Sequence, residues 1–333
     1  MSQPLPTKAV DVDQSIADQL AQHRPELVGY CYRMLGSVFD AEDATQEALI
    51  RAWRAYDRFD GRSSLRSWLY RIATNVCLDV LDAKKRRARP MDLSSPSPAP
   101  TTPGDQLAEA AWIEPIPDNM ILSTSDNPAE AAVSQESIQL AFIAALQHLP
   151  PRQRAVLLLR DVVGLRAGDV GELMGSTVTS VTSALQRARS TLAARRDSTS
   201  ESEAVPPLSD TQRALLKRYV DAFERFDMDA LAMLLHIDAT LSMPPYTTWM
   251  QGPDAIRGWL LGPGVGCRGS KLIRTVANGS PAAGQYRPSA AGHGYEPWAL
   301  QVIEVSNGRI KGINAFRDTD RWFPLFGLPS RLD

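Results

Sequence analysis

Apolar residues recur at helical spacing through the first quarter of the chain, and the pattern predicts two amphipathic helices. The stretch 40–59 places its apolar residues on one stripe, and the stretch 65–80 forms a second stripe that includes Trp68. The first stripe consists of Ala41, Ala44, Ala48, Leu49, Ala52, Trp53 and Tyr56, and the opposite face carries Asp43, Gln46, Glu47, Ile50 and Arg54. An acidic face with an outward isoleucine is either an ordinary solvated surface or a surface for a protein partner.

The stretch 153–196 has the pattern of a short helix, a tight turn and a longer helix. We expect helices over 153–162 and 167–174, then a longer helix from Thr177 that has Ser176 as its N-cap. The inward stripe of the last helix is Val178, Val181, Leu185, Ala188 and Leu192, and its outward residues are Ser180, Ser183 and Arg187. This arrangement is either a helix-turn-helix, whose second helix enters a major groove, or an ordinary helical hairpin.

From residue 208 onward the pattern changes from helices to strands, which predicts an α+β fold. The pair Asn307–Gly308 lies between two alternating apolar runs and predicts a β-hairpin. Candidate pocket residues, chosen by chemical type, are His236, Asp238 and Tyr246, with Trp249 and Trp298 as candidate walls. Their spacing identifies no acid–base pair.

Length and composition describe a protein of several domains. A chain of 333 residues predicts two or three folded domains. No apolar run reaches the roughly 20 residues of a membrane helix and the start lacks a signal-peptide pattern, so we expect a cytoplasmic protein without membrane contact. The three cysteines and four histidines are scattered, and the sequence predicts no metal site, disulfide or cofactor.

The formal net charge of −2 conceals blocks of opposite sign. Residues 91–149 carry eight acidic and no basic side chains, whereas residues 150–196 carry eight basic and three acidic ones. Prolines and small polar residues near 91–105 and 195–210 predict flexible linkers, because such segments bury little apolar surface. The predicted boundaries are 12–90 and 130–196 for two helical domains, 91–129 and 197–207 for linkers, and 208–333 for the last domain.

Five Lys or Arg residues occupy six consecutive positions, 84–89, at the end of the second predicted helix. Cations at a helix C-terminus interact favourably with the helix dipole, which is one explanation. A cationic helix end that binds a phosphate backbone is the other, and five cations are more than a cap requires.

Together, these modules resemble a bacterial RNA polymerase sigma factor of the extracytoplasmic-function (ECF) group. The resemblance lies in "DAEDATQEALIRAWRAYDRFDGRSSLRSWLYRIATNVCLDVLDAKKRR", "LQHLPPRQRAVLLLRDVVGL" and "VTSALQRARSTL". The last domain resembles the SnoaL-like cone, and "WIEPIPD" at 112–118 looks like the linker of sigma factors with that extension. The implied architecture is two all-α sigma domains, a region two helical bundle and a region four helix-turn-helix, followed by an α+β SnoaL-like cone.

The resemblance also implies roles for individual residues. Asp43, Gln46 and Glu47, around Ile50, would dock on the clamp helices of the polymerase β′ subunit. The melted, single-stranded minus ten element would be held by Asp60, Gly61, Arg62, Ser63, Ser64, Asn75, Lys84, Lys85, Arg86, Arg87 and Arg89. The duplex minus thirty-five element would be contacted by Ser180, Ser183, Gln186 and Arg187. Thr182 and Ala184 replace cations common in the family, so we expect weak DNA binding without polymerase.

The leading hypothesis is an alternative sigma factor that binds core RNA polymerase, directs promoter recognition, melting and initiation, and is regulated by its C-terminal domain. The acidic linker would mimic nucleic-acid charge in the polymerase cleft or act as a soluble tether. A small-molecule ligand or an anti-sigma protein would be a further partner. The alternative is a DNA-binding regulator that senses a small molecule through the cone, and a cone enzyme with a DNA-binding appendage is a third reading that we do not favour.

Overall fold

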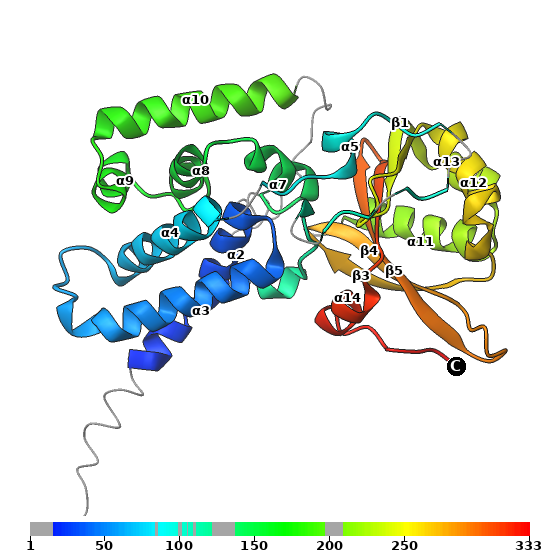
Figure 1. Ribbon diagram of the computed structural model, residues 1–333, viewed down its shortest axis with the longest axis horizontal. Coiled ribbons are helices and arrows are strands. Elements are labelled where there is room, and N and C mark those ends of the chain that lie inside the picture. The colour runs from blue at the N-terminus through cyan, green and yellow to red at the C-terminus, as the bar shows by residue number, and fades with distance from the viewer. Residues whose placement is uncertain are drawn as a thin grey trace, which may run out of the picture. The chain divides into compact units, whose positions relative to one another are not determined.

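The computed structural model divides into two compact units (Figure 1). The described residues are 16–83, 86–98, 102–104, 106–108, 111–121, 137–196 and 209–333. The first unit lies within Met1–Lys85, Asn119–Ser123 and Ala145–Arg195, and the second within Arg86–Asp118, Thr124–Ala144 and Arg196–Asp333. The two helical modules expected from the sequence therefore share one unit, and the described residues of 91–118 group with the C-terminal module.

The first part of the first unit is a bundle of three long helices. These are α2 (Arg24–Leu35), α3 (Val38–Ala55), which is followed by the turn η1 (Tyr56–Arg58), and α4 (Leu65–Ala83). Gly36 ends α2 in the left-handed conformation (φ 71°), and the Ser37 hydroxyl then caps α3 by accepting the backbone N–H of Asp40 at 3.1 Å. The two predicted helices are confirmed, but Trp53 was wrongly placed on the buried stripe, because its side chain is 49% exposed.

The remainder of the first unit contains the predicted helix-turn-helix. Its elements are α8 (Pro151–Leu157), the π-helical turn η4 (Leu158–Val162), α9 (Ala167–Met174) and α10 (Val178–Arg196); α7 (Leu140–Gln147) precedes them and spans the division between the units. Gly175 ends α9 with φ 59°, which a residue with a Cβ atom rarely adopts. The N-cap of α10 is Thr177, whose hydroxyl accepts the backbone N–H of Ser180 at 3.1 Å, so the prediction of Ser176 was wrong by one residue.

The second unit is built on one six-stranded sheet with the order β2-β1-β6-β5-β4-β3, in which β1 and β6 run parallel and the other pairs antiparallel. The strands are β1 (Leu235–Ser242), β2 (Trp249–Gln251), β3 (Lys271–Ala277), β4 (Ser280–Pro288), β5 (Tyr295–Ser306) and β6 (Arg309–Phe316). The predicted hairpin at Asn307–Gly308 is confirmed, with φ of 49° and 69° at these residues. A second hairpin of the same kind, at Asn278–Gly279, was not predicted although its sequence signal is identical.

Helices cover both faces of this sheet (Figure 1). They are α11 (Asp210–Glu224), α12 (Met228–Ala232), α13 (Pro253–Leu261), the turn η5 (Pro263–Cys267) and α14 (Thr319–Leu325). Side chains of α11, α12 and α13 share one apolar core with the inner face of the sheet. On the outer face, Phe323 and Trp322 of α14 make edge contacts with Tyr286 and Phe316, with ring centroids 5.0 and 6.0 Å apart.

The segment 86–118 is part of the second unit and forms specific contacts with it. It includes α5 (Pro90–Leu93), and η3 (Asp118–Met120) begins at its end. The Trp249 indole N–H donates to the carbonyl of Ser94 at 3.0 Å, and Gln106 forms an antiparallel bridge with Tyr246. The flexible linker predicted from 91 onward is therefore corrected over its described residues up to 118, because this backbone finds partners on the C-terminal module.

Candidate functional site

The predicted polymerase-binding face lies along α3. Asp43 and Gln46 are exposed, and Glu47 is half-exposed and pairs with Arg51 at 2.7 Å. Ile50 is partly buried, so the expectation of a fully outward isoleucine is corrected. The large apolar side chain with the greatest exposure among the described residues of this helix is Trp53, at 49%. The helix therefore presents polar and acidic groups beside an exposed aromatic ring, which is suited to a protein partner.

The predicted minus ten loop lies between η1 and α4. All five of its residues, Asp60, Gly61, Arg62, Ser63 and Ser64, are exposed. The Arg62 backbone N–H donates to the Asp60 carboxylate and lowers its pKa, and the Arg62 side chain, which pairs with Asp60, adds to this shift. Ser64 accepts the backbone N–H of Ser67 at 3.1 Å and so begins α4. Its hydroxyl thus has a structural role, whereas the Arg62 side chain is open to solvent.

The basic segment divides into exposed and buried positions. Asn75 on α4 and Arg86 are exposed, and Arg89 is partly buried, whereas Lys84 and Lys85 lie outside the described residues. Arg87 is only 6% exposed. The prediction of Arg87 as a solvent-facing contact for the DNA backbone is therefore corrected for this conformation.

Arg87 belongs to a buried ionic cluster of the second unit. Its guanidinium donates to the carbonyl of Trp112 at 2.6 Å and lies 3.4 Å from the Glu114 carboxylate. Glu114 is 2% exposed, and its carboxylate lies 3.5 Å from the guanidinium of Arg321, a residue of α14 in the C-terminal module. The cluster thus joins the basic segment, the segment 111–118 and the C-terminal module, and no local pattern in the sequence indicated it.

Asn278 provides a second attachment of the same segment. Its side-chain oxygen accepts the backbone N–H of Ile116 at 3.0 Å, and its amide group donates to the carbonyl of Ile138 at 2.8 Å. In the following residue, the Gly279 N–H donates to the Asp118 carboxylate at 2.8 Å. Burial raises the pKa of Asp118 to about 6, and the Gly279 hydrogen bond opposes this shift. The unpredicted hairpin turn is therefore also an anchor for the segment before α7.

The recognition helix α10 presents most of its predicted contacts to solvent. Ser180, Gln186 and Arg187 are exposed, and Ser183 is partly buried. Val178 was wrongly placed on the inward stripe: it is 52% exposed in the first turn, whereas Val181 is 2% exposed. The N-terminal turn of a recognition helix is the part that commonly reaches base edges, so Val178 adds an apolar group to this candidate surface.

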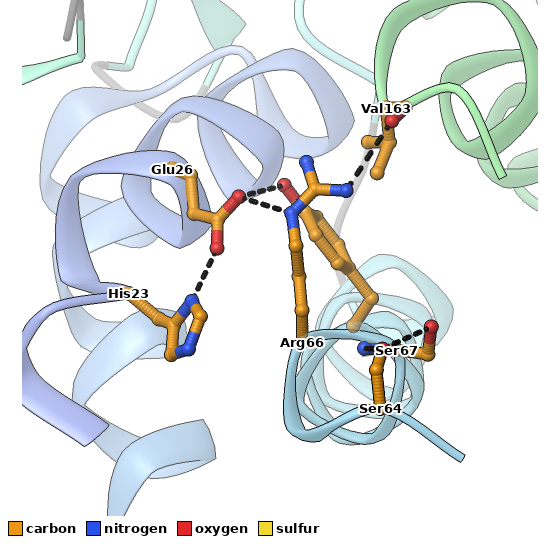
Figure 2. Close-up of polar contacts among 7 residues, drawn as sticks. His23, Glu26, Ser64, Arg66, Ser67 and Val163 are labelled. Atoms are coloured by element: carbon orange, nitrogen blue, oxygen red, sulfur yellow. Dashed lines mark hydrogen bonds and ion pairs between the residues drawn. The ribbon is translucent and has the colours of Figure 1, made fainter. Parts of the chain in front are cut away.

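A polar network inside the first unit joins its bundle to its helix-turn-helix (Figure 2). Arg66 of α4 donates to Glu26 at 2.7 Å and to the carbonyl of Val163 at 3.4 Å. Glu26 also accepts from Tyr70 at 3.2 Å and lies 2.5 Å from His23. The exposed loop 60–64 immediately precedes this network, which fixes the start of α4 against the chain after η4.

Buried Arg154 makes a second connection inside the same unit. It is 2% exposed and donates to the backbone carbonyls of Met34, at the end of α2, and of Leu149. It also donates to the side-chain and the backbone oxygen of Gln147. A buried guanidinium is tolerated when several carbonyl oxygens satisfy its N–H groups. The arginine was read from the sequence only as part of the region four pattern, without this role.

The cone contains a cavity of about 30 Å³ between α11, α13 and the inner face of the sheet. Trp298 lines it, as predicted, but His236, Asp238, Tyr246 and Trp249 are not among its lining residues. His236 and Asp238 lie along β1, where the His236 ring accepts the backbone N–H of Asp238 at 3.1 Å. Trp249 instead binds Ser94, as described above. The lining residues are Tyr219, Phe223, Leu241, Met243, Trp259, Leu260, Cys267, Gln285, Trp298, Ala299, Gln301, Ile313, Ala315 and Arg317.

Comparison with known proteins gives the same three parts in the same order. Residues 20–87 match the Sigma-70 region 2 family, 139–192 match Sigma-70 region 4, and 216–313 match the SnoaL-like domain. The ECF RNA polymerase sigma factor SigG of Mycobacterium tuberculosis is 44% identical over 315 residues, which cover 93% of this chain and 83% of that protein. The chain belongs to the ECF RNA polymerase sigma factors. The expectation of an ECF sigma factor with a C-terminal SnoaL-like domain is confirmed.

Other sigma factors support the assignment. The ECF sigma factor SigW of Bacillus subtilis is 32% identical over 180 residues, covering 54% of this chain and 87% of SigW. The crystal structure of the sigma factor SigJ of M. tuberculosis matches with a TM-score of 0.58 and 22% identity over 94% of this chain and 98% of that one, which confirms the fold. None of the helices in the described part of this sigma factor combines the length and apolarity that crossing a bilayer requires.

Proposed function

We propose that this sigma factor binds core RNA polymerase through the exposed face of α3, with the β′ clamp helices as its docking site. Asp43, Gln46 and Glu47 would supply polar contacts, and Trp53 would add apolar area next to the partly buried Ile50. The observation that carries this proposal is an acidic helix face in the same compact unit as a helix-turn-helix.

Promoter DNA would be contacted by two surfaces of this unit. The melted minus ten strand would meet the loop 60–64 and Asn75. Arg86 and Arg89, which the second unit includes, are separate candidates for attracting the DNA backbone. The duplex minus thirty-five element would meet the exposed side of α10, with Val178 in contact with a thymine methyl group. A small-molecule ligand of the cone and an anti-sigma protein remain part of the proposal for its partners.

Charge reversal tests the polymerase contact. We expect the double variant Asp43→Lys, Glu47→Lys to lose co-purification with core RNA polymerase, because the introduced lysines would repel a surface that selects acidic groups. The matched control is Asp210→Lys, Asp229→Lys, since these acids are 98% and 77% exposed on the other unit. If both double variants bind polymerase as the unaltered protein does, α3 is not the docking face.

We further propose that the C-terminal module regulates initiation by holding the segment 86–118. Arg87 would be withheld from promoter DNA while Glu114, which also pairs with Arg321, binds it, and Asn278 would hold the far end of the segment. Release of the segment would then expose Arg87 next to the already exposed Arg86. A purified transcription assay tests this: Asn278→Gly should increase transcript yield, whereas Asn307→Gly, in the other hairpin, should not. Equal yields from both variants would contradict the proposed restraint.

A further inference from the structure

Three side chains of the cone form a cationic stack, and two of them, Trp298 and Arg317, line the cavity. The guanidinium carbon of Arg287 on β4 lies 3.2 Å from the ring centroid of Trp298 on β5, and that of Arg317, directly after β6, lies 3.5 Å from it. Two guanidinium groups this close to one centroid must occupy opposite faces of the indole. The ring therefore separates two like charges, each of which gains cation–π attraction.

The positive charge of this stack is not balanced by acids in the described part of the chain. The hydrogen bonds of Arg317 and Arg287 go instead to neutral groups: the Arg317 Nε donates to the Trp298 carbonyl at 3.0 Å, and an Arg287 terminal nitrogen to the Cys267 sulfur at 3.1 Å. The Arg287 Nε is buried, and no described protein atom accepts its hydrogen. Burial, and secondarily Arg287, lowers the pKa of Arg317 to about 10. Arg317 is thus a cation at the cavity wall without an acidic partner among the described residues, and an anion would be stabilised beside it.

The other polar groups of the cavity already satisfy one another. The Tyr219 hydroxyl donates to Gln301 at 2.8 Å, Gln301 donates to Gln285 at 2.8 Å, and Gln285 donates to Ser270 at 3.0 Å. This row fixes the three side chains against the sheet and requires no further partner. Arg317 lines the cavity, and its terminal nitrogens have no acceptor among the described residues.

We propose that this cavity binds a short-chain monocarboxylate, whose carboxylate pairs with Arg317 and whose tail contacts the apolar lining. A guanidinium presents parallel N–H groups that match the two oxygens of a carboxylate. Leu241, Leu260 and Ile313 are among the lining residues and provide the apolar contact for the tail. A cavity of about 30 Å³ accommodates little more than a few heavy atoms, since one water needs roughly 10–15 Å³ by this measure, so the ligand is compact.

This inference goes beyond the proposed function and does not rest on it, because binding is measured without polymerase or DNA. The probes are sodium propionate, its neutral isostere propionamide, and sodium chloride at equal ionic strength, each added to the full chain. Binding is followed by thermal melting and by saturation-transfer NMR of the ligand methyl signal. We expect propionate to raise the melting temperature and to show saturation transfer, whereas propionamide and chloride do neither. Equal effects of propionate and propionamide, or no effect of either, would overturn the proposal without any variant.

Variants then locate the site. Arg317→Gln should weaken propionate binding at least about tenfold, the loss of one charge-assisted contact, and circular dichroism would verify that it is folded. Arg317→Lys keeps the charge but not the forked guanidinium, and its propionate affinity should lie between those of the unaltered protein and Arg317→Gln. The matched control is Arg257→Gln on α13, because Arg257 pairs with Asp229 at the surface of the same module. Propionate affinity that is unchanged in folded Arg317→Gln, or equally reduced in Arg257→Gln, would overturn the assignment of the ligand to this cavity.

Discussion

The ionic cluster around Glu114 allows a quantitative test of how the segment 86–118 is held. The perturbation is Glu114→Gln, which keeps the size of the side chain and removes its charge. Glu114 is 2% exposed and lies within 3.5 Å of both Arg87 and Arg321, so the substitution removes the carboxylate charge that faces the buried Arg87.

The expected magnitude follows from the burial of each partner. Removing one member of a buried ion pair costs roughly 3–5 kcal/mol, because the remaining charge stays desolvated. Arg87 is 6% exposed and meets that condition, whereas Arg321 is 22% exposed and can be hydrated in part. We therefore expect the lower end of the range, about 3 kcal/mol, for the free energy of opening this segment.

Amide hydrogen exchange on the full chain measures this free energy directly. The amides of Ala88 and Ile113 report on the segment, because each donates to a backbone carbonyl within it, Ala111 for Ala88 and Ala88 for Ile113. A loss of about 3 kcal/mol corresponds to an exchange rate raised about a hundredfold. The control is Asp229→Asn, which breaks an exposed pair worth under about 1 kcal/mol. Exchange at Ala88 and Ile113 that changes no more in Glu114→Gln than in this control would refute the reasoning.

Three further predictions concern stability. Asp118, with an ordinary pKa of 3.8 and a folded pKa of about 6, favours the protonated folded state, so its contribution to unfolding free energy is lost as pH rises from about 4 to 6. Asp118→Asn should abolish this decline, at most about 3 kcal/mol, in urea unfolding at pH 4.5 and 7; an unchanged pH dependence would contradict the assignment. Asn278→Gly keeps the left-handed turn but leaves the Ile116 N–H and the Ile138 carbonyl without their side-chain partner. The free energy of unfolding should fall by about 2–4 kcal/mol, whereas Asn307→Gly should lower it by under about 1 kcal/mol. Equal urea midpoints for the two variants would disprove the anchor. Arg154→Met should destabilise the first unit by about 3–5 kcal/mol and the exposed Arg152→Met far less; a shared melting temperature would show that the carbonyl contacts of Arg154 contribute nothing.

The helices of the sigma domains were predictable because their signals are local. Gly36, Gly175 and the apolar stripes fix where helices end and which face is buried. The errors also have local causes. Val178 falls on the extension of the inward stripe, yet it lies in the first turn of α10, where its side chain is 52% exposed. Trp53 likewise lies near the end of the apolar stripe of α3. The helical periodicity of apolar residues extends to this position, but its side chain is 49% exposed.

The attachment of the segment 86–118 was not predictable from composition. Its prolines and small polar residues predict a flexible linker, because they bury little apolar surface of their own. The structure holds it instead through backbone groups, for which the acceptors and donors come from distant residues such as Thr248, Trp249 and Asn278. A composition argument counts what a segment can bury and does not register hydrogen bonds offered by another part of the chain.

The same limitation applies to the charge count that drew attention to positions 84–89. Five cations in six positions were treated as one surface, but Arg86 is exposed and Arg87 is buried against Glu114. Neighbouring residues in an extended chain point in opposite directions, so a run of like charges can serve two partners at once. In this sigma factor one cation remains open to solvent while its neighbour is fixed by an acid of the linker. Whether Arg87 becomes available therefore depends on the stability of its cluster with Glu114 and Arg321. Through Arg321, the C-terminal module influences the segment that is expected to bind melted DNA.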